Sequence, residues 1–99
     1  MANLEVLMRN CSNTTTQAVG EIFADPRGPS PIVSDVNVRI VRSSHCHLGP
    51  GDYTYMFHVD GDSGTFDLEI TGTGNPANPT KHADTALGFS GWTFNFHVV

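Results

Sequence analysis

The stretch YTYMFHVDGDSGTFDLEI, residues 53–70, decides the fold class of this 99-residue chain. Apolar side chains occupy every second position on either side of a short polar link, residues 60–64. A period of two is typical of β-strands that bury one face and expose the other. The link is rich in Asp and Gly, as tight turns are, so the pattern predicts a β-hairpin over residues 53–70.

The same alternation recurs outside this stretch. It marks residues 4–8, 36–40 and 92–98, and less regularly residues 17–24. No segment shows the 3.6-residue repeat of an amphipathic helix, and no capping box opens one. About six strands in 99 residues predict one all-β domain over residues 1–99, a small antiparallel β-sandwich or a partly open barrel.

The inward positions of these strands define the expected core. They are Leu4, Val6, Met8, Ile22, Val36, Val38, Ile40, Tyr53, Tyr55, Phe57, Val59, Phe66, Leu68, Ile70, Trp92, Phe94, Phe96 and Val98. Two segments break the pattern. Residues 25–31 hold three prolines, which cannot donate to a β-ladder, and residues 72–84 show no alternation. We expect both to be loops, and loops as long as the second are often functional.

The charge balance excludes some classes of partner. The chain has 5 Lys and Arg against 10 Asp and Glu, a net charge of −5. Nucleic acids and anionic membrane surfaces are bound through many basic contacts, which this composition does not supply. No apolar run is long enough to span a membrane, and no signal-peptide pattern opens the chain. A cytoplasmic location is therefore the default expectation.

Two residue types leave alternatives open. Cys11 and Cys46 could be two free thiols or a single disulfide. The chain has five histidines, a high number for 99 residues. The alternation of side chains along the expected strands places four of them on outward faces. If they shared one sheet face, an H-x-H pair with a third histidine could bind zinc or copper. The candidate ligands are His45, His47, His58 and His97, and the alternative is a set of solvated histidines without a cofactor.

The loop over residues 72–84 suggests a second kind of site. Small β domains that bind saccharides use loop carboxylates and amides for the hydroxyl groups and an aromatic ring for the apolar face of the sugar. The candidates here are Asn75, Asn78, His82, Asp84 and Trp92, although Trp92 could equally be a core residue.

No catalytic arrangement is visible in the chain. There is no serine elbow and no glycine-rich phosphate loop, so we do not expect an enzyme. The favoured interpretation is a binding or assembly module, with a saccharide as the first ligand to test and a protein partner as the next. The alternative is a metal-binding β domain. We also expect self-association, because apolar residues fall at outward positions of the strands: Leu7, Val41, Met56 and Val99.

Overall fold

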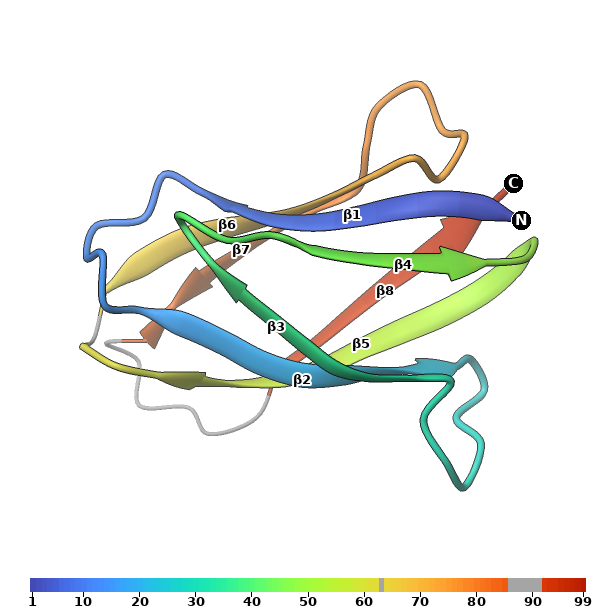
Figure 1. Ribbon diagram of the computed structural model, residues 1–99, viewed down its shortest axis with the longest axis horizontal. Coiled ribbons are helices and arrows are strands. Elements are labelled where there is room, and N and C mark those ends of the chain that lie inside the picture. Colours follow the sequence, from blue (N-terminus) through green and yellow to red (C-terminus); the bar gives the residue numbers. More distant parts are fainter. Residues whose placement is uncertain (63, 86–91) are drawn as a thin grey trace.

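The computed structural model describes residues 1–62, 64–85 and 92–99, and it confirms the all-β class (Figure 1). Eight strands form two antiparallel sheets that pack face to face as a sandwich. None of the described segments forms a helix that could cross a lipid bilayer. Sheet A has the order β4 (Ser44–Leu48), β1 (Ala2–Arg9), β6 (Thr65–Thr71), β7 (Thr80–Asp84). Sheet B has the order β3 (Val33–Arg39), β2 (Gln17–Ala24), β5 (Gly51–Asp60), β8 (Trp92–Val98).

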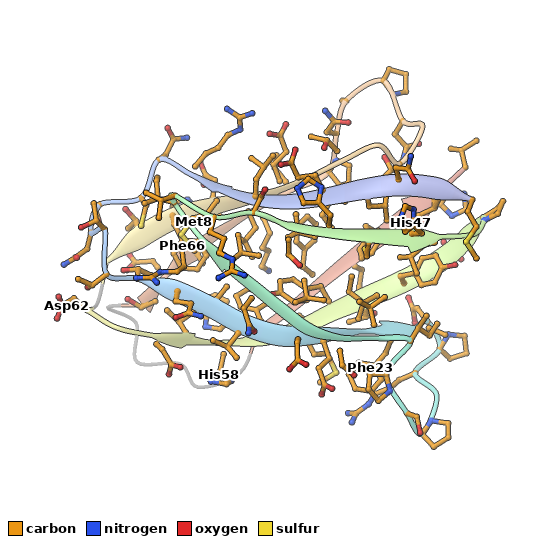
Figure 2. All side chains as sticks on the ribbon, in the orientation of Figure 1. Met8, Phe23, His47, His58, Asp62 and Phe66 are labelled. Atoms are coloured by element: carbon orange, nitrogen blue, oxygen red, sulfur yellow. The ribbon has the colours of Figure 1, made fainter. Side chains whose placement is uncertain are left out.

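The core lies between the sheets and is built from the inward residues of both. Met8 and Phe66, labelled in Figure 2, are two of these buried side chains. The expected core residues are buried with three exceptions: Val59 and Trp92 are half-buried, and Ile40 is 36% exposed. Ile40 was misplaced because the strand ends before it. Arg39 and Arg42 exchange backbone hydrogen bonds of 2.9 and 3.1 Å, which puts Ile40 at the tip of a tight turn.

The predicted hairpin over residues 53–70 is wrong, although both of its strands exist. β5 pairs with β2 and β8 in sheet B, whereas β6 pairs with β1 and β7 in sheet A. The link between them therefore crosses from one sheet to the other. Thr15 Oγ1 donates to Asp62 Oδ2 at 2.8 Å, and Thr16 Oγ1 donates to the Asp62 carbonyl at 2.9 Å. These bonds hold the link against the segment between β1 and β2.

The structure contains two strands that the sequence pattern did not predict. β4 follows the turn at Arg39–Arg42, which carries the chain from sheet B into sheet A (Figure 1). β7 lies inside the expected loop over residues 72–84 and pairs with β6 at the edge of sheet A. Only Ala83 of β7 is buried. A single buried residue does not produce the alternation of apolar and polar residues by which a strand is predicted from sequence.

The thiols and the outward apolar residues are dispersed. Cys11 and Cys46 are both free, and burial of Cys46 raises the pKa of its thiol. Of the residues expected to mediate self-association, Leu7 lies on the outer face of sheet A and Met56 on that of sheet B. Val41 is at the turn after β3, and Val99 follows β8. Self-association stays a prediction.

Candidate functional site

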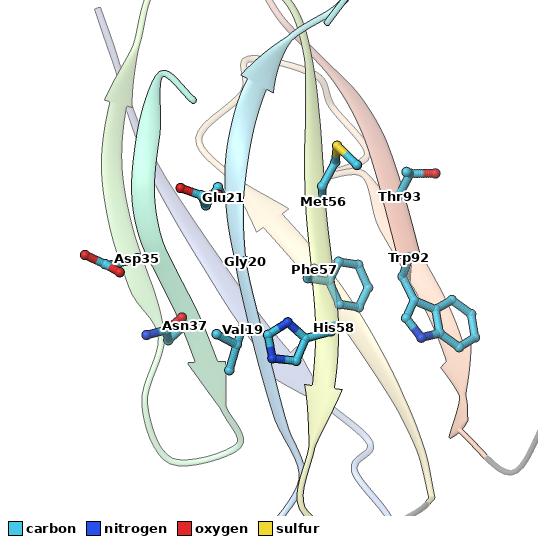
Figure 3. A pocket seen from close by; sticks show the side chains of 10 residues that line it. All are labelled: Val19, Gly20, Glu21, Asp35, Asn37, Met56, Phe57, His58, Trp92 and Thr93. Atoms are coloured by element: carbon cyan, nitrogen blue, oxygen red, sulfur yellow. The ribbon is translucent and has the colours of Figure 1, made fainter. Parts of the chain in front are cut away.

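A groove runs across the outer face of sheet B (Figure 3), and two rings from the core side of the sheet, those of Phe57 and Trp92, also contribute to its lining. Its volume is about 590 Å³, large enough for a small ligand. All four strands of the sheet contribute to it, so its walls are regular backbone rather than loops. The lining residues are Val19, Gly20 and Glu21 of β2, Asp35 and Asn37 of β3, Met56, Phe57 and His58 of β5, and Trp92 and Thr93 of β8.

Gly20 makes the floor of the groove possible. It pairs with Phe57 where β2 and β5 approach closely. A Cβ atom at Gly20 would lie 2.1 Å from the carbonyl oxygen of Met56 and 2.7 Å from the Cα of Phe57. Both are backbone atoms, which cannot move aside as a flexible side chain would. A larger residue would therefore push the two strands apart, and glycine keeps the sheet intact here.

A β-bulge in β3 introduces Asp35 into the groove. Gly20 pairs with Val36 and Ile22 pairs with Val33, so two residues of β3 oppose the single residue Glu21. The bulge residue Asp35 has a φ of 59°, in the left-handed region that few residues other than glycine adopt. Bulges of this kind re-aim a side chain and are common beside functional sites. The strained backbone thus brings a second carboxylate to the groove beside Glu21.

Three polar side chains of the groove carry acceptor oxygens that no group of the described residues engages. Within the described residues, the carboxylates of Glu21 and Asp35 make no hydrogen bond and no ion pair. The Oδ1 atom of Asn37 is shielded from solvent and accepts no hydrogen bond from this part of the chain. The second torsion of an asparagine side chain is soft, so a small rotation would present this oxygen to a ligand. The groove therefore offers several acceptors that a ligand with hydroxyl groups could satisfy.

The residues predicted to bind a saccharide are not gathered at one place. Trp92 is half-buried, lines the groove, and stacks on Phe57 with ring centroids 6.4 Å apart. His82 and Asp84 lie on β7, in the other sheet. Asn75 and Asn78 belong to the connection between β6 and β7. Asn75 Nδ2 donates to the carbonyl of His97 at 3.0 Å. His97 is near the end of β8, whereas Trp92 is at its start.

His82 instead belongs to a small polar cluster on sheet A. Its Nδ1 lies 2.7 Å from Asp67 Oδ1, and Asn10 Nδ2 donates to Asp67 Oδ2 at 2.8 Å. The pKa of Asp67 lies below its ordinary value. The hydrogen bond from Asn10 is the largest cause, and the hydrogen bond to His82 is the next. The cluster ties the end of β1 to β6 and β7.

Because the pKa of Asp67 is lowered in the fold, its cluster should make a pH-dependent contribution to the free energy of unfolding. A carboxyl whose pKa is lower in the folded state stabilises the fold above its unfolded pKa, and this contribution is lost as the pH falls through the folded pKa. We expect Asp67→Asn to lower the free energy of unfolding by about 0.5–1 kcal/mol at pH 7. The difference from the wild type should shrink below about pH 4. Urea unfolding at several pH values measures it, and a difference that does not change with pH would contradict this account.

The four histidines considered as metal ligands lie on opposite sides of the sandwich. His45 and His47 are exposed on β4 in sheet A, whereas His58 and His97 are exposed on β5 and β8 in sheet B. His97 pairs with Asp52, so along β5 it is about 20 Å from His58. The described residues contain no group of three or more His, Cys, Asp or Glu side chains that could hold a metal ion.

Acidic side chains accompany three of these histidines. His97 Nδ1 is 2.6 Å from Asp52 Oδ1, His58 Nε2 is 3.5 Å from Asp60 Oδ2, and His45 Nε2 is 3.6 Å from Glu5 Oε2. These are exposed cross-strand or same-strand pairs, whose contribution to stability is small. The arrangement does not bring the residues of the proposed metal site together.

The outward histidine His58 and the groove residues Glu21, Asp35 and Asn37 lie on one sheet face. Sequence reasoning missed the last three, because they stand among ordinary polar residues of alternating strands. Comparisons with protein-family models, with characterised proteins and with solved structures find no match to this chain.

Proposed function

We propose that this protein is a carbohydrate-binding module that holds a saccharide in the groove on sheet B. The observation that carries the proposal is a set of acceptors along an open groove that no group of the described residues engages: the solvent-accessible carboxylates of Glu21 and Asp35 and the shielded Oδ1 of Asn37. A sugar presents many hydroxyl donors, and ionised carboxylates are acceptors only. Trp92 belongs both to the saccharide site expected from the sequence and to this groove. The other proposed contacts lie on the face of sheet B and not in the connection between β6 and β7.

The apolar part of the groove supports the same class of ligand. Val19 and Met56 stand on the outer face of neighbouring strands, with the bare backbone of Gly20 beside them. Saccharides have apolar ring faces as well as hydroxyl groups, so a floor of this kind surrounded by acceptors suits them. His58 and Thr93 add groups that can donate or accept at the side formed by β5 and β8.

The direct test is a titration with a panel of oligosaccharides followed by intrinsic fluorescence. Trp92 is the single tryptophan of the chain and lines the groove, so occupancy of the groove should change its emission. We expect at least one class of saccharide to give a saturable change. If no saccharide on a broad array binds, the proposal is wrong.

The Asp35→Asn variant locates the site. Asparagine tolerates the left-handed backbone of this position, so the bulge should be retained while the charge is lost. Because hydrogen bonds to a charged group are stronger than neutral ones, we expect the affinity for a neutral saccharide to fall about tenfold at an unchanged melting temperature. Isothermal titration calorimetry measures the affinity.

Two further variants make the result specific. Asp25→Asn removes an exposed carboxylate that does not line the groove, and it should bind like the wild type. Asn78→Ala probes the connection between β6 and β7. Loss of binding in Asn78→Ala with full binding in Asp35→Asn would place the sugar at that connection and contradict the groove.

A further inference from the structure

A second pocket, of about 410 Å³, adjoins the groove beside β3 and β4. The two cavities share Asp35 and Asn37, so they form one continuous surface. The surface is mainly apolar along the groove and mainly polar in the second pocket. The remaining lining residues are Gln17, Arg39, Arg42, Ser43, Ser44 and His45.

The two arginines of this second pocket are held close together. The reciprocal backbone hydrogen bonds between Arg39 and Arg42 close a turn of only two intervening residues. Neither guanidinium makes an ion pair or a side-chain hydrogen bond with the described residues. The turn thus places two positive charges that form no ion pair at one end of the surface, in a pocket that the single carboxylate of Asp35 also lines.

This local charge is opposite to that of the whole chain. The protein carries a net charge of −5 and has only four arginines and one lysine, two of which stand here. Glu5 of sheet A accepts a hydrogen bond of 2.6 Å from Ser43, another residue that lines the pocket. Guanidinium groups bind carboxylates and sulfates through paired hydrogen bonds, so the pocket has the chemistry of an oxyanion site.

Resting on the proposed function, we infer that the natural ligand is an acidic oligosaccharide whose anionic group binds Arg39 and Arg42 while its neighbouring sugar units lie in the groove. Asp35, Asn37 and Arg39 follow one another along the same strand. At about 3.3 Å per residue, Asp35 and Arg39 are about 13 Å apart, which is longer than one sugar ring. The ligand therefore spans more than one sugar unit, and a single acidic monosaccharide binds weakly.

The experiment compares matched charged and neutral ligands on the wild-type protein. An array of short oligosaccharides carries carboxylates, sulfate esters, or neutral methyl esters of the same carboxylated chains. We expect the bound members to be acidic, and to bind about tenfold more tightly than their methyl esters. Whether carboxylates or sulfates are preferred identifies the source of the anion. Affinity for the acidic members should fall as salt is raised.

The variant Arg39→Gln/Arg42→Gln assigns the effect to the second pocket. It should lose the preference for acidic members and keep the affinity for the methyl esters. Lys81→Gln removes a positive charge from β7 in the other sheet and should leave the preference intact. Because both arginines are exposed, we expect the double variant to fold, and its melting temperature checks this.

The failures of the two proposals are distinguishable. Binding of neutral members only, or an acidic preference that survives the double variant, overturns the inference and leaves the saccharide proposal standing. Absence of any bound saccharide overturns both. A poly-glutamate peptide that binds as tightly as the best acidic saccharide would also overturn the inference, because the charge alone would then be recognised.

Discussion

Replacement of Phe66 by alanine is expected to lower the free energy of unfolding by about 3–5 kcal/mol. Phe66 is the first inward residue of β6 after the crossing link, and it is fully buried between the sheets. It pairs with the small residue Ala83, which cannot fill the space that a lost ring would leave. Urea denaturation with linear extrapolation measures the change.

The matched control for Phe66→Ala is Val41→Ala, which truncates an apolar side chain that is 82% exposed. It should change stability by no more than about 0.5 kcal/mol, as exposed substitutions generally do. A loss in Phe66→Ala as small as in Val41→Ala would show that β6 does not pack against sheet B.

Replacement of Gly61 by alanine is expected to destabilise the fold by about 2–4 kcal/mol. Gly61 lies in the link between β5 and β6 and has a φ of 92°, a conformation that residues with a side chain rarely adopt. A Cβ atom there would also lie 2.1 Å from the carbonyl oxygen of Thr15. The link would have to leave the Thr15–Thr16 segment and lose its hydrogen bonds to Asp62.

The corresponding control is Gly49→Ala, because no heavy atom beyond the two neighbouring residues in the chain lies within 4 Å of a Cβ built at Gly49. Alanine at a compatible position reduces the freedom of the unfolded chain, so this variant should be neutral or slightly stabilised. Thermal unfolding of both variants gives the comparison. If Gly61→Ala were as stable as Gly49→Ala, the path of the crossing link would have to be different.

The candidate site was only partly predictable from the sequence. Trp92 was named as a ligand-binding candidate and does line the groove, and His58 was expected to point outward. Asp35 could not have been found in this way, because its position depends on a bulge that exists only in the pairing of β3 with β2. Glu21 and Asn37 become candidate ligand-binding residues only because the bulge brings Asp35 beside them in the groove.

The second pocket depends even more on tertiary structure. Arg39 and Arg42 are near one another in the sequence, but their position next to the groove follows from the turn that carries the chain between sheets. A pair of arginines in an acidic chain is too common a feature to indicate a site by itself. The shared residues Asp35 and Asn37 supply the connection.

The sequence by itself determined the strand class and the inward face of most strands. This was possible because side chains alternate across any strand, whatever its partners are. It also placed His45 and His47 on an outward face, and both are exposed in the structure. These are local properties of an extended backbone, and a pattern of apolar residues is enough to predict them.

The tertiary structure alone decided which strands pair. Residues 53–70 have the same alternation whether their two strands form a hairpin or belong to opposite sheets, because both arrangements bury the same side chains. The choice was made by distant partners: β2 and β8 for β5, and β1 and β7 for β6. The same long-range pairing created the bulge at Asp35, and with it the groove, since neither exists until β3 meets β2.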